Sequence, residues 1–469
     1  DSARVAGGPH APPTTPAEAR ARAEAHAVSG DYRAAVRQLY LAALLVDPTM
    51  RAEPLKIIDE WGKGFWSLIP FTLQMTMMII GGYVLATSPA VDRIIKRLAA
   101  SPTTTKGAVT LVAFFSMASS LLNWGFSVIF SAVLAREVAR RMPKADYRAL
   151  GAASCLGLGT VWAQGLSGSA ALQMASPASM PPQLVKLVGV IPLTETIFRW
   201  ESLVCVAIEI VVVSALMWLI APGPDRARTA ASMGIDLSSS SAREVLKPER
   251  QGERLEHTPL LLLPIVLVGA VYLVRSVVAR SSSWSAMVSA FDFNTINLFL
   301  LMLGALLHWT PASLMRAVRD ASPAASGVLL QYPFYAGIFG IMVGTGLSAA
   351  IANVFVHVAS ATWLPAMIFT YSAVLGVFVP SGGSKWLIEA PYMLEAAKTL
   401  NVHLGWVVQT YNATEALANL IHPFWMLPLV GMLGLKPRDI VGYSMLQFIV
   451  HVPLVFFLVW ALNFTLSYV

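Results

Sequence analysis

Four short clusters of small and polar residues interrupt apolar segments of this chain, and they carry the side chains best suited to binding chemistry. Within an apolar helix, such a cluster frees backbone N–H and C=O groups. The N-terminus of a half-helix attracts a carboxylate, whereas freed carbonyls and Ser, Thr or Asn oxygens coordinate Na⁺. Because the clusters hold many oxygens and few carboxylates, they predict a site for a monovalent cation and a small anion, not for a divalent metal. The clusters are Asn123 with Gly125, Ser167 with Ser169, Ser381 with Gly382, Gly383 and Ser384, and Asn412 with Thr414 and Asn419.

Three charged residues lie in or beside these apolar segments. Lys385 follows the Pro-Ser-Gly-Gly-Ser stretch at 380–384, where it would attract an anion or cap a backbone carbonyl. Glu415 lies in the fourth cluster, and Glu209 lies near the middle of the segment 200–221. Carboxylates inside a membrane are costly and mark functional sites, so either glutamate is a candidate proton carrier.

No nucleophile elbow, P-loop or zinc-protease motif occurs in the sequence. We therefore predict no catalytic residue, no metal centre and no cofactor beyond a coupling Na⁺ or H⁺. Other features have simpler explanations. The glycines of Gly337-x-x-Gly340-x-x-x-Gly344 predict a helix-packing face, and isolated histidines such as His451 are interpreted as packed or interfacial.

The composition indicates a polytopic, all-α membrane protein. Of the 469 residues, 56% are hydrophobic and 13% are charged, against about 25% charged in soluble domains. The net charge of +7 is concentrated in loops, which indicates membrane topology and not nucleic-acid binding. Apolar segments of about 20 residues are candidate membrane spans. They are 65–88, 108–135, 150–176, 200–221, 259–278, 293–309, 326–346, 363–379, 404–433 and 441–466, whereas 351–360 is too short to cross alone.

Basic loops constrain the topology. Residues 136–148 carry five Lys or Arg and residues 223–257 carry six, so the positive-inside rule places both in the cytoplasm. Residues 91–106 carry four more, and they would lie on the opposite side if 108–135 crossed completely. We therefore predict that 108–135 is a re-entrant hairpin.

The linker 223–257 separates two halves that present the same order of signals. Each half has an interrupted apolar run, at Asn123 or at 379–383, then an amphipathic arm and then a broken helix. This matched order predicts two inverted repeats, each with a re-entrant hairpin and a broken transmembrane helix, as in secondary transporters. The predicted divisions are 1–53 (a polar extension), 54–222 (repeat 1), 223–257 (cytoplasmic linker) and 258–469 (repeat 2).

Residues 1–53 differ from the rest of the chain. Residues 17–48 have the pattern of two short amphipathic helices, similar to one tetratricopeptide-like pair, which needs a neighbour to bury its apolar face. The alternative is a poorly ordered extension, since disorder concentrates at termini.

Several motifs together resemble the bacterial short-chain fatty acid transporter family, within the wider ion transporter superfamily. The resemblance covers about residues 55–469. It implies uptake of acetoacetate, butyrate or similar monocarboxylates across the cytoplasmic membrane, and a possible homodimer in the bilayer. The motifs are Trp-Gly-Lys-Gly-Phe-Trp at 61–66, Asn-Trp-Gly-Phe at 123–126, Leu-Gln-Tyr-Pro-Phe-Tyr-Ala-Gly at 330–337, Val-Pro-Ser-Gly-Gly at 379–383 and His-Pro-Phe-Trp at 422–425.

The polar clusters, the charged residues and the resemblance together predict which residues surround the substrate. They are Asn123, Trp124, Gly125, Ser167, Ser169, Pro380, Ser381, Gly382, Gly383, Lys385, Asn412 and Glu415, with Asn123, Ser381, Asn412, Thr414 and Asn419 as the cation-coupling set.

The chain departs from the family at three places. Residues 1–53 contain no 20-residue apolar span, where the family has an apolar first helix. Gly376 stands where the family tends to have Asn, and Lys385 stands where it tends to have His. These two substitutions predict a different substrate preference or ion coupling.

We predict a cation-coupled secondary transporter that works by alternating access. One alternative is a membrane-embedded enzyme acting on lipid or acyl substrates, which would need a nucleophile and base or a metal cluster. The other is an anion channel, which would be expected to show a continuous polar stripe along its helices.

Overall fold

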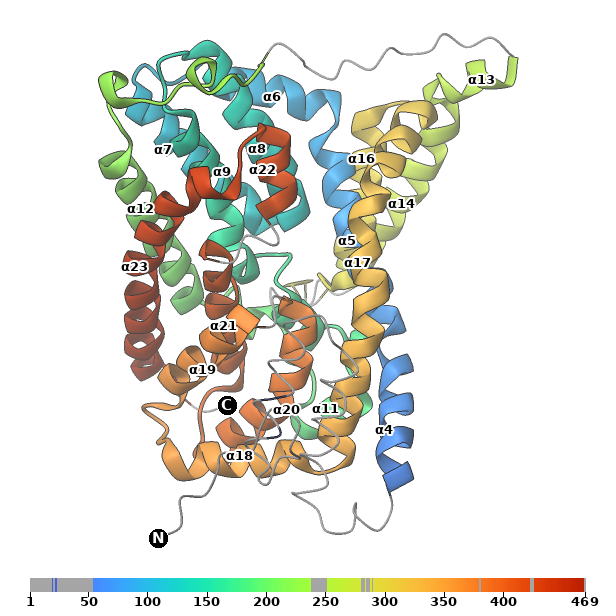
Figure 1. Ribbon diagram of the computed structural model, residues 1–469. Coiled ribbons are helices and arrows are strands. Elements are labelled where there is room, and N and C mark those ends of the chain that lie inside the picture. The colour runs from blue at the N-terminus through green and yellow to red at the C-terminus, as the bar shows by residue number, and fades with distance from the viewer. Residues whose placement is uncertain are drawn as a thin grey trace.

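The computed structural model describes residues 54–237, 251–279, 283, 287, 288, 290–378, 381–421 and 426–467, together with residues 19 and 22. Every regular element within these ranges is a helix (Figure 1). The first half contains α4 (Pro54–Ser67), α5 (Ile69–Ala86), α6 (Pro89–Ala99), α7 (Thr105–Leu122), α8 (Trp124–Arg141), α9 (Tyr147–Gly159), α10 (Ser169–Ala175), α11 (Pro182–Val188) and α12 (Trp200–Ile220). The second half contains α13 (Gln251–Glu256), α14 (Leu262–Val278), α16 (Phe293–His308), α17 (Pro311–Gly344), α18 (Leu347–Val358), α19 (Leu364–Phe378), α20 (Gly382–Leu400), α21 (Leu404–Glu415), α22 (Leu427–Leu433) and α23 (Pro437–Leu462).

The predicted all-helical, polytopic class is confirmed. Seven helical stretches among the described residues are long and apolar enough to cross a membrane, while α16, α18 and α19 are apolar but shorter. The seven stretches are Leu55–Ala86, Thr105–Leu122, Tyr147–Ala175, Trp200–Ile220, Pro259–Val278, Pro311–Gly344 and Pro437–Thr465.

Helix α17 is longer than its apolar sequence indicates. It starts at Pro311, where Thr310 Oγ1 accepts a hydrogen bond from Ser313 N, and not near residue 326. Its first turns contain polar residues, so the hydropathy of the sequence does not indicate a helix there. At its other end, α17 packs against α4 along the predicted glycine face. A Cβ on Gly340 or Gly64 would collide with the backbone of the other helix, so the packing role of these glycines is confirmed.

Helices α7 and α8 form an antiparallel pair joined at Asn123. Asn123 ends α7, and its Oδ1 accepts a hydrogen bond from Phe126 N to begin α8. Ser127 Oγ donates back to Ser116 O at 2.8 Å, which holds the two helices together. Helix α8 therefore returns to the end of the molecule where α7 began, the upper end in Figure 1.

The basic segments gather at this upper end. Helix α6, the end of α8 and the segment that follows α12 all lie there (Figure 1). Arg136 Nη2 donates to Asp236 O at 3.0 Å, and Arg228 N donates to Asp146 Oδ2 at 2.9 Å. The described parts of the three basic segments thus share one end, as the hairpin hypothesis for 108–135 requires.

Helices α19 and α20 occupy the opposite, lower half of the molecule (Figure 1). Between them, residues 379 and 380 lie outside the described range, and α20 begins at Gly382. The short helix α18 lies across the lower end in this view, which fits the expectation that 351–360 does not cross alone.

Two helices are interrupted within the core. Helix α9 ends at Gly159, and after a short 3-10 turn at Trp162–Gln164 the chain resumes as α10 at Ser169. Helix α21 ends at Glu415 and passes through a 3-10 turn at Leu417–Leu420. The second break therefore starts after Glu415, and not at Asn412 as the sequence indicated.

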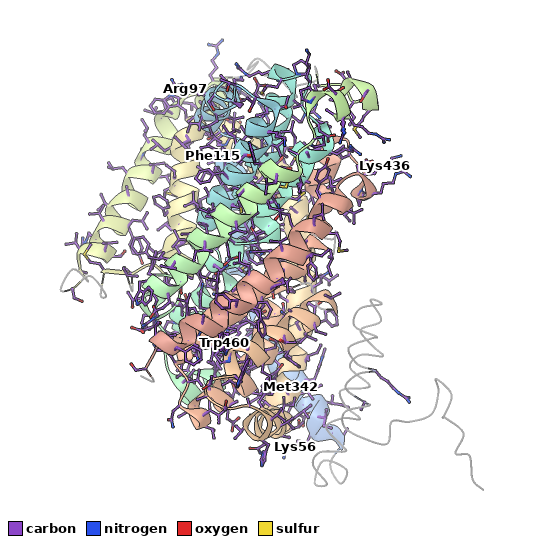
Figure 2. The ribbon with its side chains drawn as sticks, turned by 90° about the vertical axis from the view of Figure 1, so that its left-hand side faces the viewer. Lys56, Arg97, Phe115, Met342, Lys436 and Trp460 are labelled. Carbon is purple, nitrogen blue, oxygen red and sulfur yellow. The ribbon has the colours of Figure 1, made fainter. Side chains whose placement is uncertain are left out.

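On the outer face, α12 and α23 run side by side, with α23 descending from Lys436 toward Trp460 (Figure 2). Gln447 Nε2 of α23 donates to Val213 O of α12 at 3.2 Å. Both helices expose large apolar side chains such as Trp218 and Ile449, which suits contact with lipid.

Candidate functional site

A buried cavity lies where two helix starts meet two helix interruptions. The start of α8 is called the first tip and the start of α20 the second tip. The interruption after α9 is called the first break and the one after α21 the second break. The cavity has a volume of about 30 Å³. One water needs about 10–15 Å³ by the same measure. In this conformation the space therefore suits only a very small ligand. The lining residues are Met75, Trp124, Leu158, Trp162, Ser169, Val328, Tyr332, Gly382, Glu415 and Asn419.

Two long helices open their N-termini toward this cavity. Trp124 is the first residue of α8, and Gly382 is the first residue of α20. Both residues line the cavity, so the partial positive charge of two helix ends faces the same space. This arrangement favours a bound anion.

Lys385 places a full positive charge beside the cavity. Its side chain is completely buried, and its Nζ lies 2.8 Å from Glu415 Oε2. The ammonium also donates to Ser372 O at 3.0 Å and to Ser372 Oγ at 3.2 Å, and it lies 4.7 Å from the ring centroid of Tyr411. Lys385 therefore binds an anionic group and caps a carbonyl of α19 at once, whereas the sequence left these two roles as alternatives.

A second carboxylate belongs to the same cluster. Ser372 Oγ donates to Glu389 Oε2 at 2.6 Å, and Glu389 is fully buried. Glu389 lies one helical turn after Lys385 on α20. Glu389 was not among the residues predicted from the sequence, and its spacing of four residues from Lys385 was the available signal.

The first tip and the first break are joined by hydrogen bonds. Trp124 N donates to Ser167 Oγ at 2.9 Å, and Leu166 N donates to Leu121 O at 2.7 Å. Asn123 is buried, but its side chain caps α8 and its Nδ2 contacts Met78. Asn123 thus builds the tip, and it is not among the residues that line the cavity.

The second tip packs closely against the first break. A Cβ on Gly383 would meet the ring of Phe71 and the side chain of Ser169, and one on Gly382 would meet Trp162. Glycine at both positions lets the tip approach the break. Ser381 Oγ donates to Ser384 Oγ at 3.1 Å, while Pro380 lies outside the described residues.

The predicted residues of the second break divide into two groups. Asn419 lines the cavity and its Nδ2 donates to Leu158 O at 3.0 Å, so it joins the two breaks. Asn412 and Thr414 lie in the regular part of α21 and do not line the cavity. Thr414 Oγ1 donates to Tyr411 O of its own helix at 2.7 Å. Residues 422–425, with the predicted His-Pro motif, lie outside the described range.

Glu209 forms a separate buried cluster. Its Oε2 lies 2.7 Å from His451 Nε2 of α23, and neither side chain has exposed surface. Gln164 Nε2 of the first break donates to Glu209 Oε1 at 2.7 Å, and Gln409 Nε2 of α21 donates to Gln164 Oε1 at 3.1 Å. Glu209 thus contacts a broken segment that is distant in sequence, and His451 is its hydrogen-bond partner, not merely a packed residue.

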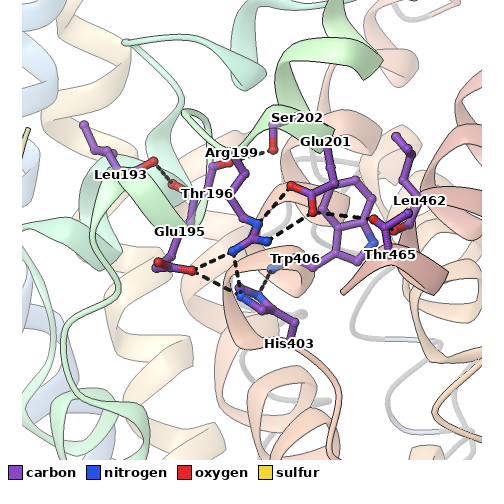
Figure 3. A network of polar contacts seen from close by, with 10 residues as sticks. All are labelled: Leu193, Glu195, Thr196, Arg199, Glu201, Ser202, His403, Trp406, Leu462 and Thr465. Atoms are coloured by element: carbon purple, nitrogen blue, oxygen red, sulfur yellow. Dashed lines mark hydrogen bonds and ion pairs between the residues drawn. The ribbon is translucent and has the colours of Figure 1, made fainter. Parts of the chain in front are cut away.

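A third polar network ties the start of α12 to the start of α21 (Figure 3). Arg199 contacts both Glu195 and Glu201, and its Nη1 lies 3.2 Å from His403 Nε2. Hydrogen bonding to Glu201 raises the pKa of Arg199 despite its partial burial. Burial, with a contribution from Arg199, lowers the pKa of His403, whose Nδ1 accepts a hydrogen bond from Trp406 N and caps α21. The neutral imidazole is therefore favoured here.

No group of three or more His, Cys, Asp or Glu residues suited to hold a metal ion occurs within the described ranges. Cys155 and Cys205 are both buried and free. The cavity lining offers helix N-termini, one carboxylate and neutral polar groups such as Asn419, and the ammonium of Lys385 pairs with that carboxylate.

Comparison with known proteins decides the family. The family model for short-chain fatty acid transporters matches residues 35–463 of this chain. The chain belongs to the short-chain fatty acid transporter family. Its members include a putative short-chain fatty acid transporter of Escherichia coli K12, 35% identical over 390 residues, which are 83% of this chain and 86% of that protein. Another, from Haemophilus influenzae, is 30% identical over 405 residues, which are 86% of this chain and 89% of that protein.

Solved structures support the fold of this family member. The YdaH transporter of Alcanivorax borkumensis aligns with a TM-score of 0.53 and 15% identity, over 90% of this chain and 89% of its own. MtrF of Neisseria gonorrhoeae, described as illuminating a class of antimetabolite efflux pumps, aligns with a TM-score of 0.55 and 15% identity, over 88% of this chain and 84% of its own. The chain is thus a multi-pass membrane protein of a transporter family and not an enzyme.

Proposed function

We propose that this protein moves short-chain fatty acids such as butyrate or acetoacetate across the cytoplasmic membrane, by alternating access coupled to Na⁺ or H⁺. The observation that carries the proposal is the convergence of two helix N-termini on one small buried cavity, with Lys385 paired to the lining residue Glu415. A carboxylate headgroup suits these positive groups, and Trp162 and Met75 offer apolar surface to a short acyl chain.

The topology extends this proposal. The pairs α7–α8 and α19–α20 lie in opposite halves of the molecule (Figure 1). We take them as re-entrant hairpins of two inverted repeats, with the basic upper end in the cytoplasm. The substrate site then lies between the tips, where either side of the membrane can be opened to it. Whether two copies form a dimer remains a prediction.

Of the five residues predicted to bind the coupling cation, one lines the cavity and four do not. Asn419 lines the cavity, whereas Asn123, Ser381, Asn412 and Thr414 lie behind its wall. The last turn of α21 ends at Glu415, so its partial negative charge faces a cation near the cavity. A coupling cation is thus proposed on the α21 side, opposite the helix N-termini that receive the carboxylate.

Counterflow of labelled butyrate or acetoacetate in proteoliposomes tests the function, with and without a Na⁺ or pH gradient. Uptake of either carboxylate, enhanced by one gradient, is the expected result. Ser381→Ala should reduce uptake while the protein still inserts into the membrane. Absence of counterflow under every gradient would contradict the transport assignment.

The anion channel makes a different prediction in the same assay. A channel would pass carboxylate down its electrochemical gradient without counterflow stimulation. We favour the transporter because the residues that line the cavity are mostly buried, whereas a channel needs a path that is open to both sides at once.

A further inference from the structure

A buried charged cluster next to the cavity, formed by Lys385, Glu389 and the lining residue Glu415, holds more carboxylates than cations. Lys385 and Glu389 have no exposed surface, and Glu415 is 5% exposed. Lys385 pairs with Glu415 and donates to Ser372, whose hydroxyl donates to Glu389. With all three groups ionised, the cluster carries one excess negative charge. Because uncompensated buried charge is costly, this cluster is a poor host for a further anion.

A substrate carboxylate that enters the cavity meets this cost directly. The ammonium of Lys385 is occupied by Glu415, and Glu415 itself lines the cavity. A carboxylate that reaches Lys385 therefore displaces Glu415, which is left buried without its cation. Protonation of the displaced glutamate removes this cost, and it needs no additional space in so small a cavity.

We propose that the substrate carboxylate replaces Glu415 on Lys385 and that the displaced Glu415 takes up the coupling proton. One proton moves from water to a carboxylate oxygen of Glu415, no other covalent bond forms or breaks, and Lys385 keeps its charge. Substrate and proton thus enter together as a neutral pair. This inference rests on the proposed function and specifies its coupling ion.

The neighbours of Lys385 keep the ammonium in place during the exchange. Ser372 accepts from it at two atoms, and the Tyr411 ring lies 4.7 Å away. Tyr411 is itself fixed, because its hydroxyl donates to Gly382 O at 2.6 Å. When Glu415 leaves, the cation therefore stays at the same point of the cavity wall.

Within the part of the chain that the structure describes, few other titratable groups face Glu415 from the elements packed around it. Helix α10 and the 3-10 turn of the first break contribute Ser169 and Gln164, which do not titrate, and Tyr371 of α19 pairs with Tyr392. The groups that do titrate are Lys385 and Glu389 from α20, Tyr411 from α21, Tyr332 from α17 and His451 from α23. His451 is already in contact with Glu209.

Proton uptake on binding is the first test. Butyrate is added to the purified full-length protein in weak buffer with a pH indicator, and affinity is measured at several pH values. Wild type should take up about one proton per butyrate bound. Its affinity should rise by up to about tenfold for each unit of falling pH, because the bound state holds the additional proton. Glu415→Gln should still bind butyrate, with no proton uptake and no such pH dependence.

Glu389→Gln is the matched control, since it removes the other carboxylate of the cluster. It should leave proton uptake in place. Loss of proton uptake in Glu389→Gln but not in Glu415→Gln would overturn the assignment. Butyrate affinity that depends on Na⁺, with no proton uptake by wild type, would also overturn it. Glu415→Asp, which keeps a carboxylate, should retain proton uptake and serves if Glu415→Gln does not fold.

A transport assay distinguishes failure of this inference from failure of the proposed function. Glu415→Gln in proteoliposomes should retain butyrate counterflow but lose accumulation driven by a pH gradient. If wild type shows no counterflow at all, the proposed function itself fails. If wild type shows counterflow but binds butyrate without a proton, only the exchange on Lys385 fails.

Discussion

Two buried glutamates, Glu415 and Glu209, lie in the same apolar protein but have different surroundings. Glu415 lines the cavity and has one strong partner, the ammonium of Lys385. Glu209 is completely buried and is held by His451, Gln164 and Cys205, three groups from three segments. Hydropathy does not show which glutamate lines the cavity or how many partners each one has, since each glutamate simply interrupts an apolar run.

The comparison shows that partners, and not burial, decide what a carboxylate can do. Glu415 is released if one ion pair is replaced by another of the same type, and the cavity supplies a route for the replacement. Glu209 can leave only if several hydrogen bonds break together. We therefore assign exchange chemistry to Glu415 and a positioning role to Glu209, which fixes the first break through Gln164.

The largest expected effect is on stability, at Glu209. Glu209→Ala leaves His451 and Gln164 buried without their acceptor, and breaking such a pair costs about 3–5 kcal/mol. Thermal unfolding of the detergent-solubilised protein should show a large decrease in Tm. Glu415→Gln should change Tm less, because Ser372 O and Oγ still accept hydrogen bonds from Lys385.

Replacing the whole Glu209 pair sharpens this prediction. Glu209→Leu combined with His451→Leu removes both partners, and such a change is often nearly neutral for stability. The double variant should therefore be more stable than Glu209→Ala. If both variants are equally destabilised, the Glu209–His451 pair stabilises the fold by more than the mutual neutralisation of its two polar groups.

The next effect is on transport, at Lys385. Lys385→Ala removes the proposed carboxylate partner and leaves Glu415 without its cation. Loss of one member of a buried charge pair costs about 2–5 kcal/mol, so butyrate affinity should fall by roughly 30-fold or more. Uptake kinetics in proteoliposomes measure this, with Lys398→Ala, an exposed lysine at the other end of α20, as the control. Similar kinetics in both variants would contradict the role of Lys385.

The sequence predicted the helical class, most apolar segments and the positions of three of the four interruptions. Glycine, proline and serine inside apolar runs are local signals, so Asn123 and the Gly382–Gly383 stretch were found correctly. The fourth break was displaced because Tyr411, Asn412 and Thr414 are polar but continue the helix. Their hydrogen bonds run within α21, and that could not be read from residue type alone.

Partners that come from distant segments could not be predicted. Glu209 and His451 lie 242 positions apart, and only the packing of α12 on α23 brings them together. Lys385 and Glu415 were both identified as functional candidates, but their pairing depends on the approach of α20 to α21. The sequence supplied the chemical groups, and tertiary contacts determine which charges neutralise each other.

The smallest expected effect is at His403, in the third charged network, which joins the starts of α12 and α21 (Figure 3). Its pKa is lowered by burial and by Arg199, so the folded state binds a proton less readily than the unfolded state, whose reference pKa is 6.5. Its contribution to stability is therefore complete above about pH 6.5 and is lost as the pH falls through the lowered value. His403→Asn keeps a side-chain cap for α21 and removes the titrating group.

Tm profiles of wild type and His403→Asn should thus agree at neutral pH and diverge in acid. The variant should be the more stable of the two at low pH. Parallel profiles over the whole range would show that His403 does not report on pH. Glu415→Gln provides the contrast, since its pH effect should appear in butyrate binding and not in Tm. Each network is then distinguished by its own readout: stability for Glu209, ligand binding for Glu415, and acid sensitivity for His403.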